Sequence, residues 1–166
     1  MHGFPHFAVS IAVKVKNSIH YGVIYDPLRQ EIFSAVRGSG AQLNARRIRV
    51  SKQMGLTQSL LGTGFPFKNK EIADQYFNSF QTIFHQCSGI RRAGSAALDL
   101  AYVAAGRLDG YWEYSLKPWD IAAGALMVKE AGGLVTDFDG AEQYLSNGNI
   151  VAANPKLIRE LLQNLR

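Results

Sequence analysis

The stretch KPWDIAAGALMVKEAGG (residues 117–133) decides the fold, because it predicts a helix with clear signals at both ends. Pro118 stands near its start and Gly132 and Gly133 close it, and these residue types are favoured just inside the beginning and just beyond the end of a helix. Asp120 lies in the first turn, where a carboxylate either caps the helix or contacts a ligand.

Residues 51–166 alternate predicted strands and helices around this stretch. A short strand that ends in a Gly/Pro loop is expected within residues 59–67, and further strands are expected at residues 108–114, 133–140 and 149–154. Helices are expected at residues 69–87, 94–106, 117–133 and 155–166, the second opened by Gly94 and Ser95 and ended by Gly106. Strands alternating with helices predict an α/β lobe with a mixed sheet.

Residues 1–50 predict an antiparallel meander, the first part of a layered α+β or α/β fold. The strand around FAVSIAVKV places small residues (Ala8, Ser10, Ala12) on one face and Val9, Ile11, Val13 and Val15 on the other. The small face indicates that another layer packs closely on it, and the neighbouring sequence offers no helix for that role. We therefore expect an incomplete meander whose N-terminal portion is missing.

Composition limits the class of protein. The chain has 166 residues, enough for one domain or two small lobes. It shows no apolar run of about 18 residues and no leader peptide, and the single Cys87 excludes an internal disulfide, so we expect a cytoplasmic protein with no membrane contact.

The net charge of +5 suits an anionic partner, either nucleic acid or a phosphorylated metabolite. The basic residues are scattered, however, and no nucleic-acid-binding motif accompanies them.

Two carboxylates are the best candidates for chemistry. Glu113 ends a predicted strand and Asp120 opens the next helix, and ligands of α/β sheets bind where strands end and helices begin. Carboxylates there can hold a hard cation or accept hydrogen bonds from sugar hydroxyls. Gly94, Ser95 and Ala96 open another helix, whose free N–H groups suit a polar or anionic ligand. The sequence contains no nucleophile elbow, P-loop or dinucleotide motif, and its four histidines show no zinc-ligand spacing.

WDIAAGALMVKEAGG (residues 119–133) resembles the C-terminal signature of the inositol monophosphatase family, the Mg²⁺-dependent, lithium-sensitive sugar phosphatases. The resemblance extends to GIRRAGSAALDLAYVAAGRLDGYWEYSLKPWD (residues 89–120) and to HGFPHFAVSIAV (residues 2–13). It covers essentially the whole chain and is closest to the bacterial members. It implies the sugar-phosphatase fold, with residues 1–50 as part of the N-terminal sheet and residues 51–166 as the C-terminal lobe.

The resemblance also implies roles for individual residues. Asp120 is similar to an aspartate that ligates Mg²⁺ and touches the inositol ring, and Glu113 to an acid that binds ring hydroxyls. Gly94, Ser95 and Ala96 match the helix-opening segment that faces the substrate. Arg91 and Arg92 are expected to be structural or dimer-interface residues rather than phosphate ligands, and the loop GTGFPF receives no role.

Further metal ligands of the family lie in an N-terminal glutamate and in the motif Asp-Pro-Leu/Ile-Asp-Gly-Thr, both expected before residue 2. The similar DPLRQ at residues 26–30 predicts a turn instead, with Pro27 after an aspartate. Mg²⁺ needs several well-placed oxygens. We therefore assign no catalytic residue, and we expect the chain to carry the ring-binding half of the site with little activity of its own.

The leading interpretation is an inositol-1-monophosphatase-like enzyme that hydrolyses a small sugar or polyol phosphate monoester and forms a homodimer. Fructose-bisphosphate and adenosine-bisphosphate phosphatases are alternatives within the same superfamily. A binding role in RNA metabolism or transcription is the alternative from a different class. The apolar face of the meander is expected to favour self-association.

Overall fold

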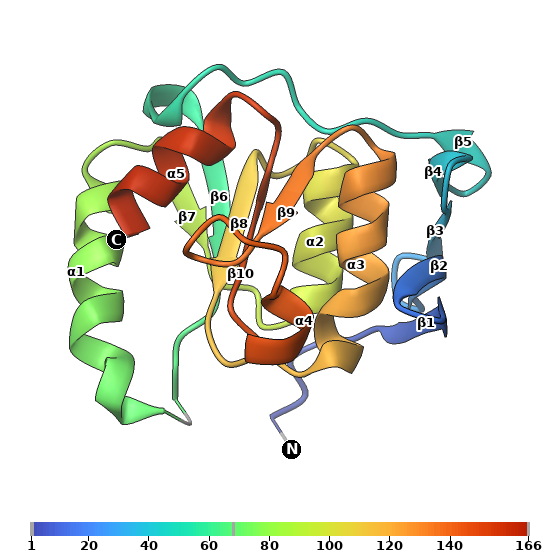
Figure 1. The fold of residues 1–166 in the computed structure, drawn as a ribbon, viewed down its shortest axis with the longest axis horizontal. Coiled ribbons are helices and arrows are strands. Elements are labelled where there is room, and N and C mark those ends of the chain that lie inside the picture. Colours follow the sequence, from blue (N-terminus) through green and yellow to red (C-terminus); the bar gives the residue numbers. More distant parts are fainter. Residues whose placement is uncertain (1, 68, 166) are drawn as a thin grey trace.

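The protein is built from four layers, as a computed structural model of the chain shows for residues 2–67 and 69–165 (Figure 1). One helical layer, α1 and α5, covers the outer face of a mixed sheet. A second layer, α2 and α3, lies between this sheet and an antiparallel sheet at the other side of the molecule. The predicted combination of an antiparallel sheet with an α/β lobe is confirmed.

The antiparallel sheet is the predicted meander. Its strands are β1 (Val9–Val15), β2 (Ser18–Asp26), β3 (Glu31–Val36), β4 (Gly40–Leu43) and β5 (Arg46–Arg47), and they pair in chain order. Residues 27–30 form the turn between β2 and β3, as predicted for DPLRQ. Asp26 Oδ1 accepts from the backbone N–H groups of Leu28 and Arg29, and its Oδ2 accepts from Arg29 Nη1 at 2.8 Å. This carboxylate therefore stabilises a turn.

The second sheet is mixed and has the order β7-β6-β8-β10-β9. Its strands are β6 (Leu60–Thr63), β7 (Gly89–Arg91), β8 (Gly110–Glu113), β9 (Leu134–Thr136) and β10 (Ile150–Ala153). β6 runs parallel to both β7 and β8, whereas β10 is antiparallel to its two neighbours. β7 is the strand that sequence analysis missed. The antiparallel sheet ends at Arg47 and the mixed sheet begins at Leu60. The lobe boundary predicted at residue 50 falls between these two residues, and its exact position stays a prediction.

The helices lie where their end signals predict. They are α1 (Ala73–Phe84), α2 (Ala96–Ala104), α3 (Pro118–Glu130), α4 (Tyr144–Asn147) and α5 (Leu157–Leu165), with short 3₁₀ turns at Leu56–Gln58 and Lys70–Ile72. The short α4 was not predicted. On α1, Tyr76 and Ile83 are buried, whereas Phe84 is 58% exposed and stacks on Phe80. No helix among the described residues is both long and apolar enough to cross a membrane.

Small residues allow α3 to pack against its neighbours at short distance. A Cβ on Gly22 of β2 would lie only 3.1 Å from the backbone of Ala123, and one on Gly124 would lie 2.5 Å from Leu100 Cβ of α2. α3 is therefore the layer that covers the small face of the meander. The expectation that this chain offers no such layer was wrong, because the covering helix follows β2 by about ninety residues and no local pattern reveals the contact.

The opposite face of the antiparallel sheet is apolar and exposed. Val9, Ile11 and Val13 are 54%, 58% and 46% exposed. Their cross-strand partners Tyr25, Val23 and Tyr21 lie on the same face, and of these Val23 and Tyr21 are also exposed. Large exposed apolar patches tend to find partners, so self-association through this face stays a prediction.

Gly124→Ala should lower the free energy of unfolding, although alanine is the better helix former by about 1 kcal/mol. The added methyl group would meet Leu100 Cβ, and such overpacking typically costs about 1–3 kcal/mol. Chemical denaturation measures the change. Gly89→Ala is the control, since its new Cβ would have neighbours no closer than 3.4 Å. Equal stability of both variants would contradict the proposed tight contact.

Candidate functional site

Three parallel strands end at one pocket of about 480 Å³. Gly64 follows β6, Arg92 follows β7 and Glu113 is the last residue of β8, so each strand brings one residue to the pocket wall. Ligands of α/β sheets bind at the carboxyl ends of parallel strands. The pocket also brings together the five residues selected from the sequence, namely Gly94, Ser95, Ala96, Glu113 and Asp120.

The N-terminus of α2 forms one side of this pocket. Gly94 adopts a positive φ of 99°, which glycine accepts without strain, and Ser95 is the N-cap, whose Oγ accepts from the Leu98 N–H at 3.4 Å. The first N–H groups of a helix have no intrahelical partner. Ala96 and Ala97 line the pocket at this helix end, which therefore suits a polar or anionic group.

Asp120 caps its helix and also lines the pocket. Its Oδ2 accepts from the Lys117 N–H at 3.0 Å, which helps to cap α3. The residue also lines the pocket, and its Oδ1 accepts no hydrogen bond from the residues that the structure describes. One oxygen therefore stabilises the helix while the other remains available to a ligand.

Glu113 is held by two neighbours. Tyr111 Oη donates to Glu113 Oε2, and the carboxyl group lies directly over the Cα of Gly64, where any Cβ would overlap with it. Burial raises the pKa of Glu113, Tyr111 and Arg92 oppose the rise, and the nearby Asp120 carboxylate adds to it. Glycine at position 64 is thus a requirement of this arrangement, and sequence analysis gave that loop no role.

Arg92 is the cationic side chain of the pocket wall. Its guanidinium lies 5.7 Å from the ring centre of Phe65 and 5.1 Å from that of Phe67. These contacts fit the predicted structural role, but the residue also faces the ligand space. Sequence analysis missed other pocket residues, His6, Ser10 and Trp119, because only the fold brings the N-terminal segment to α3.

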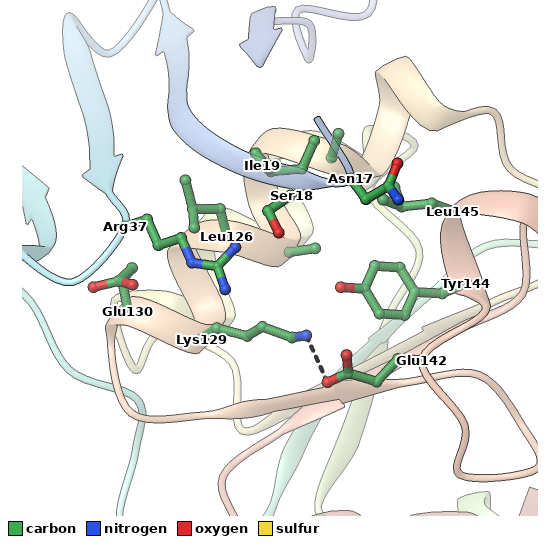
Figure 2. Close-up of a pocket in the computed structure, with 12 residues that line it drawn as sticks. Asn17, Ser18, Ile19, Arg37, Leu126, Lys129, Glu130, Glu142, Tyr144 and Leu145 are labelled. Carbon is green, nitrogen blue, oxygen red and sulfur yellow. Dashed lines mark hydrogen bonds and ion pairs between the residues drawn. The ribbon is translucent and has the colours of Figure 1, made fainter. Parts of the chain in front are cut away.

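A second pocket, of about 350 Å³, lies between the β1–β2 turn, the end of α3 and α4 (Figure 2). Lys129 pairs with Glu142 at 2.9 Å. Glu130 accepts from the backbone N–H groups of Gly38 and Gly40, both at 2.8 Å. Both carboxylates thus already have partners within the chain, and those of Glu130 tie the antiparallel sheet to α3. We therefore take the first pocket as the candidate site.

Comparison with known proteins decides the relationship. A sequence profile of the inositol monophosphatase family matches residues 1–166. The chain belongs to the inositol monophosphatase family. The layered arrangement and the matched signature segments agree with this assignment, and the expected fold class is confirmed.

Three members of this family show how far the similarity reaches. Nus factor SuhB of Escherichia coli strain K12 is 55% identical over 162 residues, which are 98% of this chain and 61% of that protein. The structure of the extragenic suppressor protein suhB from Bartonella henselae matches with a TM-score of 0.96 at 48% identity, over 99% of this chain and 63% of that one. The structure of the inositol monophosphatase from Anabaena (Nostoc) matches with a TM-score of 0.94 at 43% identity. The match covers 99% of this chain and 68% of that one. The chain spans about 61% of the length of the curated relatives.

Inositol monophosphatases are generally Mg²⁺-dependent, which allows a test of the residues present here. The described residues contain no group of three or more histidine, cysteine, aspartate or glutamate side chains that could hold a metal ion. Asp120 offers one free oxygen, and Tyr111 occupies one oxygen of Glu113. Mg²⁺ requires near-octahedral oxygen coordination. These side chains therefore do not form a complete magnesium site by themselves.

Gly64→Ala should displace the Glu113 carboxylate without unfolding the protein. The backbone of Gly64 does not have a positive φ, so alanine is accepted there, and the group that must move is the end of a flexible side chain. We expect the pKa of Glu113 to fall toward its ordinary value, because the carboxyl group moves out of its buried position. Titration by carboxyl ¹³C NMR measures this pKa, and an unchanged value would contradict the steric role of Gly64.

Proposed function

We propose that this chain forms the polyol-binding part of a phosphoric monoester hydrolase that acts on inositol monophosphate or a similar polyol phosphate. The observation that carries the proposal is the meeting of Glu113, Asp120 and the N-terminus of α2 in one pocket. Membership of the inositol monophosphatase family supports it.

The free carboxylate oxygens suit a ring with neighbouring hydroxyl groups. Asp120 Oδ1 and Glu113 Oε1 accept no hydrogen bond from the described residues, so each can accept one from a hydroxyl. Hydrogen bonds to a charged acceptor are roughly twice as strong as neutral ones. The backbone of Gly94, Ser95 and Ala96 lines the same pocket, and its N–H groups favour the more polar end of the ligand.

We further propose Asp120 as one ligand of Mg²⁺, with the remaining ligands supplied from beyond the side chains described here. When bound, Mg²⁺ supplies an activated water and neutralises charge on the phosphate. The chain itself binds and orients the polyol. By this proposal it hydrolyses the ester slowly or not at all without additional metal ligands, because loss of one strong electrostatic stabiliser typically costs about 10²–10³ in rate.

Asp120→Asn should weaken binding of inositol 1-phosphate about tenfold or more while α3 remains capped, since an amide oxygen can still accept from Lys117. Isothermal calorimetry gives the affinity, and Mg²⁺-dependent phosphate release gives the turnover. Asp74→Asn is the matched control, because Asp74 is likewise an acid in the first turn of a helix but is exposed on α1.

Equal binding by wild type, the Asp120 variant and the Asp74 variant would contradict the proposed site. Turnover by the wild-type chain that Asp120→Asn abolishes would contradict the proposed need for further metal ligands.

A role in transcription is the second candidate, because several curated relatives at 51–55% identity carry the name Nus factor SuhB. The net charge of +5 suits an RNA partner. If this role depends on RNA, the affinity for RNA should fall steeply as salt rises and should survive Asp120→Asn, since released counterions rather than the pocket would provide the binding energy. Fluorescence anisotropy at several salt concentrations tests this, and affinity that does not depend on salt would contradict it.

A further inference from the structure

The second pocket, of about 350 Å³, is a cavity that the proposed function does not use. The β1–β2 turn, the β3–β4 turn, α3 and α4 each contribute to its wall (Figure 2). It shares no lining residue with the candidate site, and the two pockets lie toward opposite ends of α3, one beside Asp120 and the other beside Glu130. Cavities of about 300–1,000 Å³ are the size that holds small molecules.

Arg37 is the charged residue of this wall that has no partner within the described chain. The other charged lining residues are Lys129, Glu130 and Glu142. Lys129 pairs with Glu142 at 2.9 Å, and the two oxygens of Glu130 accept from backbone N–H groups. The described residues form ion pairs through Arg29, Arg107 and Lys129, and none through Arg37. Its guanidinium therefore keeps its N–H donors available.

The backbone that carries Arg37 is fixed on both sides. The Arg37 N–H donates to the carbonyl of His20 at 2.9 Å, and the N–H groups of Gly38 and Gly40 donate to Glu130 of α3 at 2.8 Å. From this turn, the guanidinium is directed into the space that Lys129 and Tyr144 also face (Figure 2). A donor whose backbone is already in place loses less conformational entropy when a ligand binds.

The remainder of the wall is largely apolar. Leu126 is buried in the core, and Ile19 and Leu145 are half-buried and pack against it. On the polar side, the Lys129 Nζ lies 5.4 Å from the ring centre of Tyr144. The pocket thus offers one free cation above an apolar floor. A ligand that fits both features has an anionic group and a compact hydrocarbon body.

The charges of the wall favour a ligand with a single negative charge. Two cationic side chains stand beside two anionic ones, and Arg37 is the free cation. A dianion such as phosphate would meet Glu130 and Glu142 without a second free cation to balance them. A carboxylate carries one charge, and its two oxygens match the fork of a guanidinium.

We propose that the second pocket binds a small carboxylate with a branched apolar body, and that Arg37 holds the carboxylate group. The bound molecule contacts the antiparallel sheet, α3 and α4 together. This ligand site goes beyond the proposed function, because it uses none of the residues of the polyol pocket. Either proposal can therefore fail while the other holds.

Isovalerate is a suitable probe, and isovaleramide has the same shape without the charge. We expect isovalerate to shift the backbone amide signals of Ser18, Gly38 and Lys129 in a ¹⁵N NMR titration. Arg37→Gln should weaken its binding about tenfold, because the variant loses a charge-assisted pair of hydrogen bonds. The wild-type protein should bind isovaleramide about tenfold more weakly than isovalerate for the same reason.

Arg46→Gln is the matched control, since Arg46 is likewise exposed on the antiparallel sheet but lies outside the pocket. Arg37 is also exposed and forms no ion pair, so both variants should fold as the wild-type protein does, which their NMR spectra verify. Equal affinity for isovalerate in all three proteins would overturn the proposal. Equal binding of the acid and its amide would overturn the anionic ligand class.

Two further titrations identify the ligand class and separate the two pockets. Inorganic phosphate should bind more weakly than isovalerate, and tighter binding of phosphate at the same amide signals would overturn the assignment to a carboxylate. myo-Inositol should leave these signals unchanged and should not displace isovalerate. Displacement would overturn the independence of the second pocket. Isovalerate binding that needs Arg37, in a protein that does not bind myo-inositol, would uphold this proposal and contradict the polyol-binding function.

Discussion

The close packing of α3 between two sheets is the constraint on which the rest of the structure depends. Residues 121–128 of this helix are all buried, so it has no solvent-exposed face along its middle. Helices that are buried all round need small side chains where neighbouring backbones approach closely. Ala123 and Gly124 meet that need, one against the backbone of β2 and the other against α2. Larger residues at these two positions would force the antiparallel sheet and the α2 layer apart.

A helix that is fixed in this way also fixes the position of its first turn. Asp120 must therefore lie beside the ends of the parallel strands, where Glu113 and the N-terminus of α2 also lie. The cap and the ligand-binding interpretations of Asp120 do not exclude each other, because a carboxylate has two oxygens and only Oδ2 is used by Lys117. One side chain thus both stabilises the start of α3 and presents an oxygen to the pocket.

Local signals in the sequence predicted the parts of the fold that depend on local physics. Pro118, Ser95 and the glycines at 132 and 133 mark helix ends through backbone hydrogen bonding, and the alternation in β1 marks a strand. The contact of α3 with the meander could not be predicted from such signals, since it joins distant segments. β7 has only three residues, too few for a periodic pattern. The position of Arg92 in the pocket wall could not be predicted for a similar reason, because the pocket arises only in the folded chain.

The charges of the pocket suggest how recognition and chemistry are divided. Glu113 and Asp120 are both acidic, Arg92 supplies one positive charge, and burial lowers the pKa of His6, which keeps that imidazole neutral near pH 7. The described wall thus carries excess negative charge when both acids are ionised. Such a surface attracts hydroxyl donors and repels a phosphate group unless cations neutralise it. The charges of the described wall therefore favour hydroxyl donors over anions, which is the physical basis of the polyol-binding proposal.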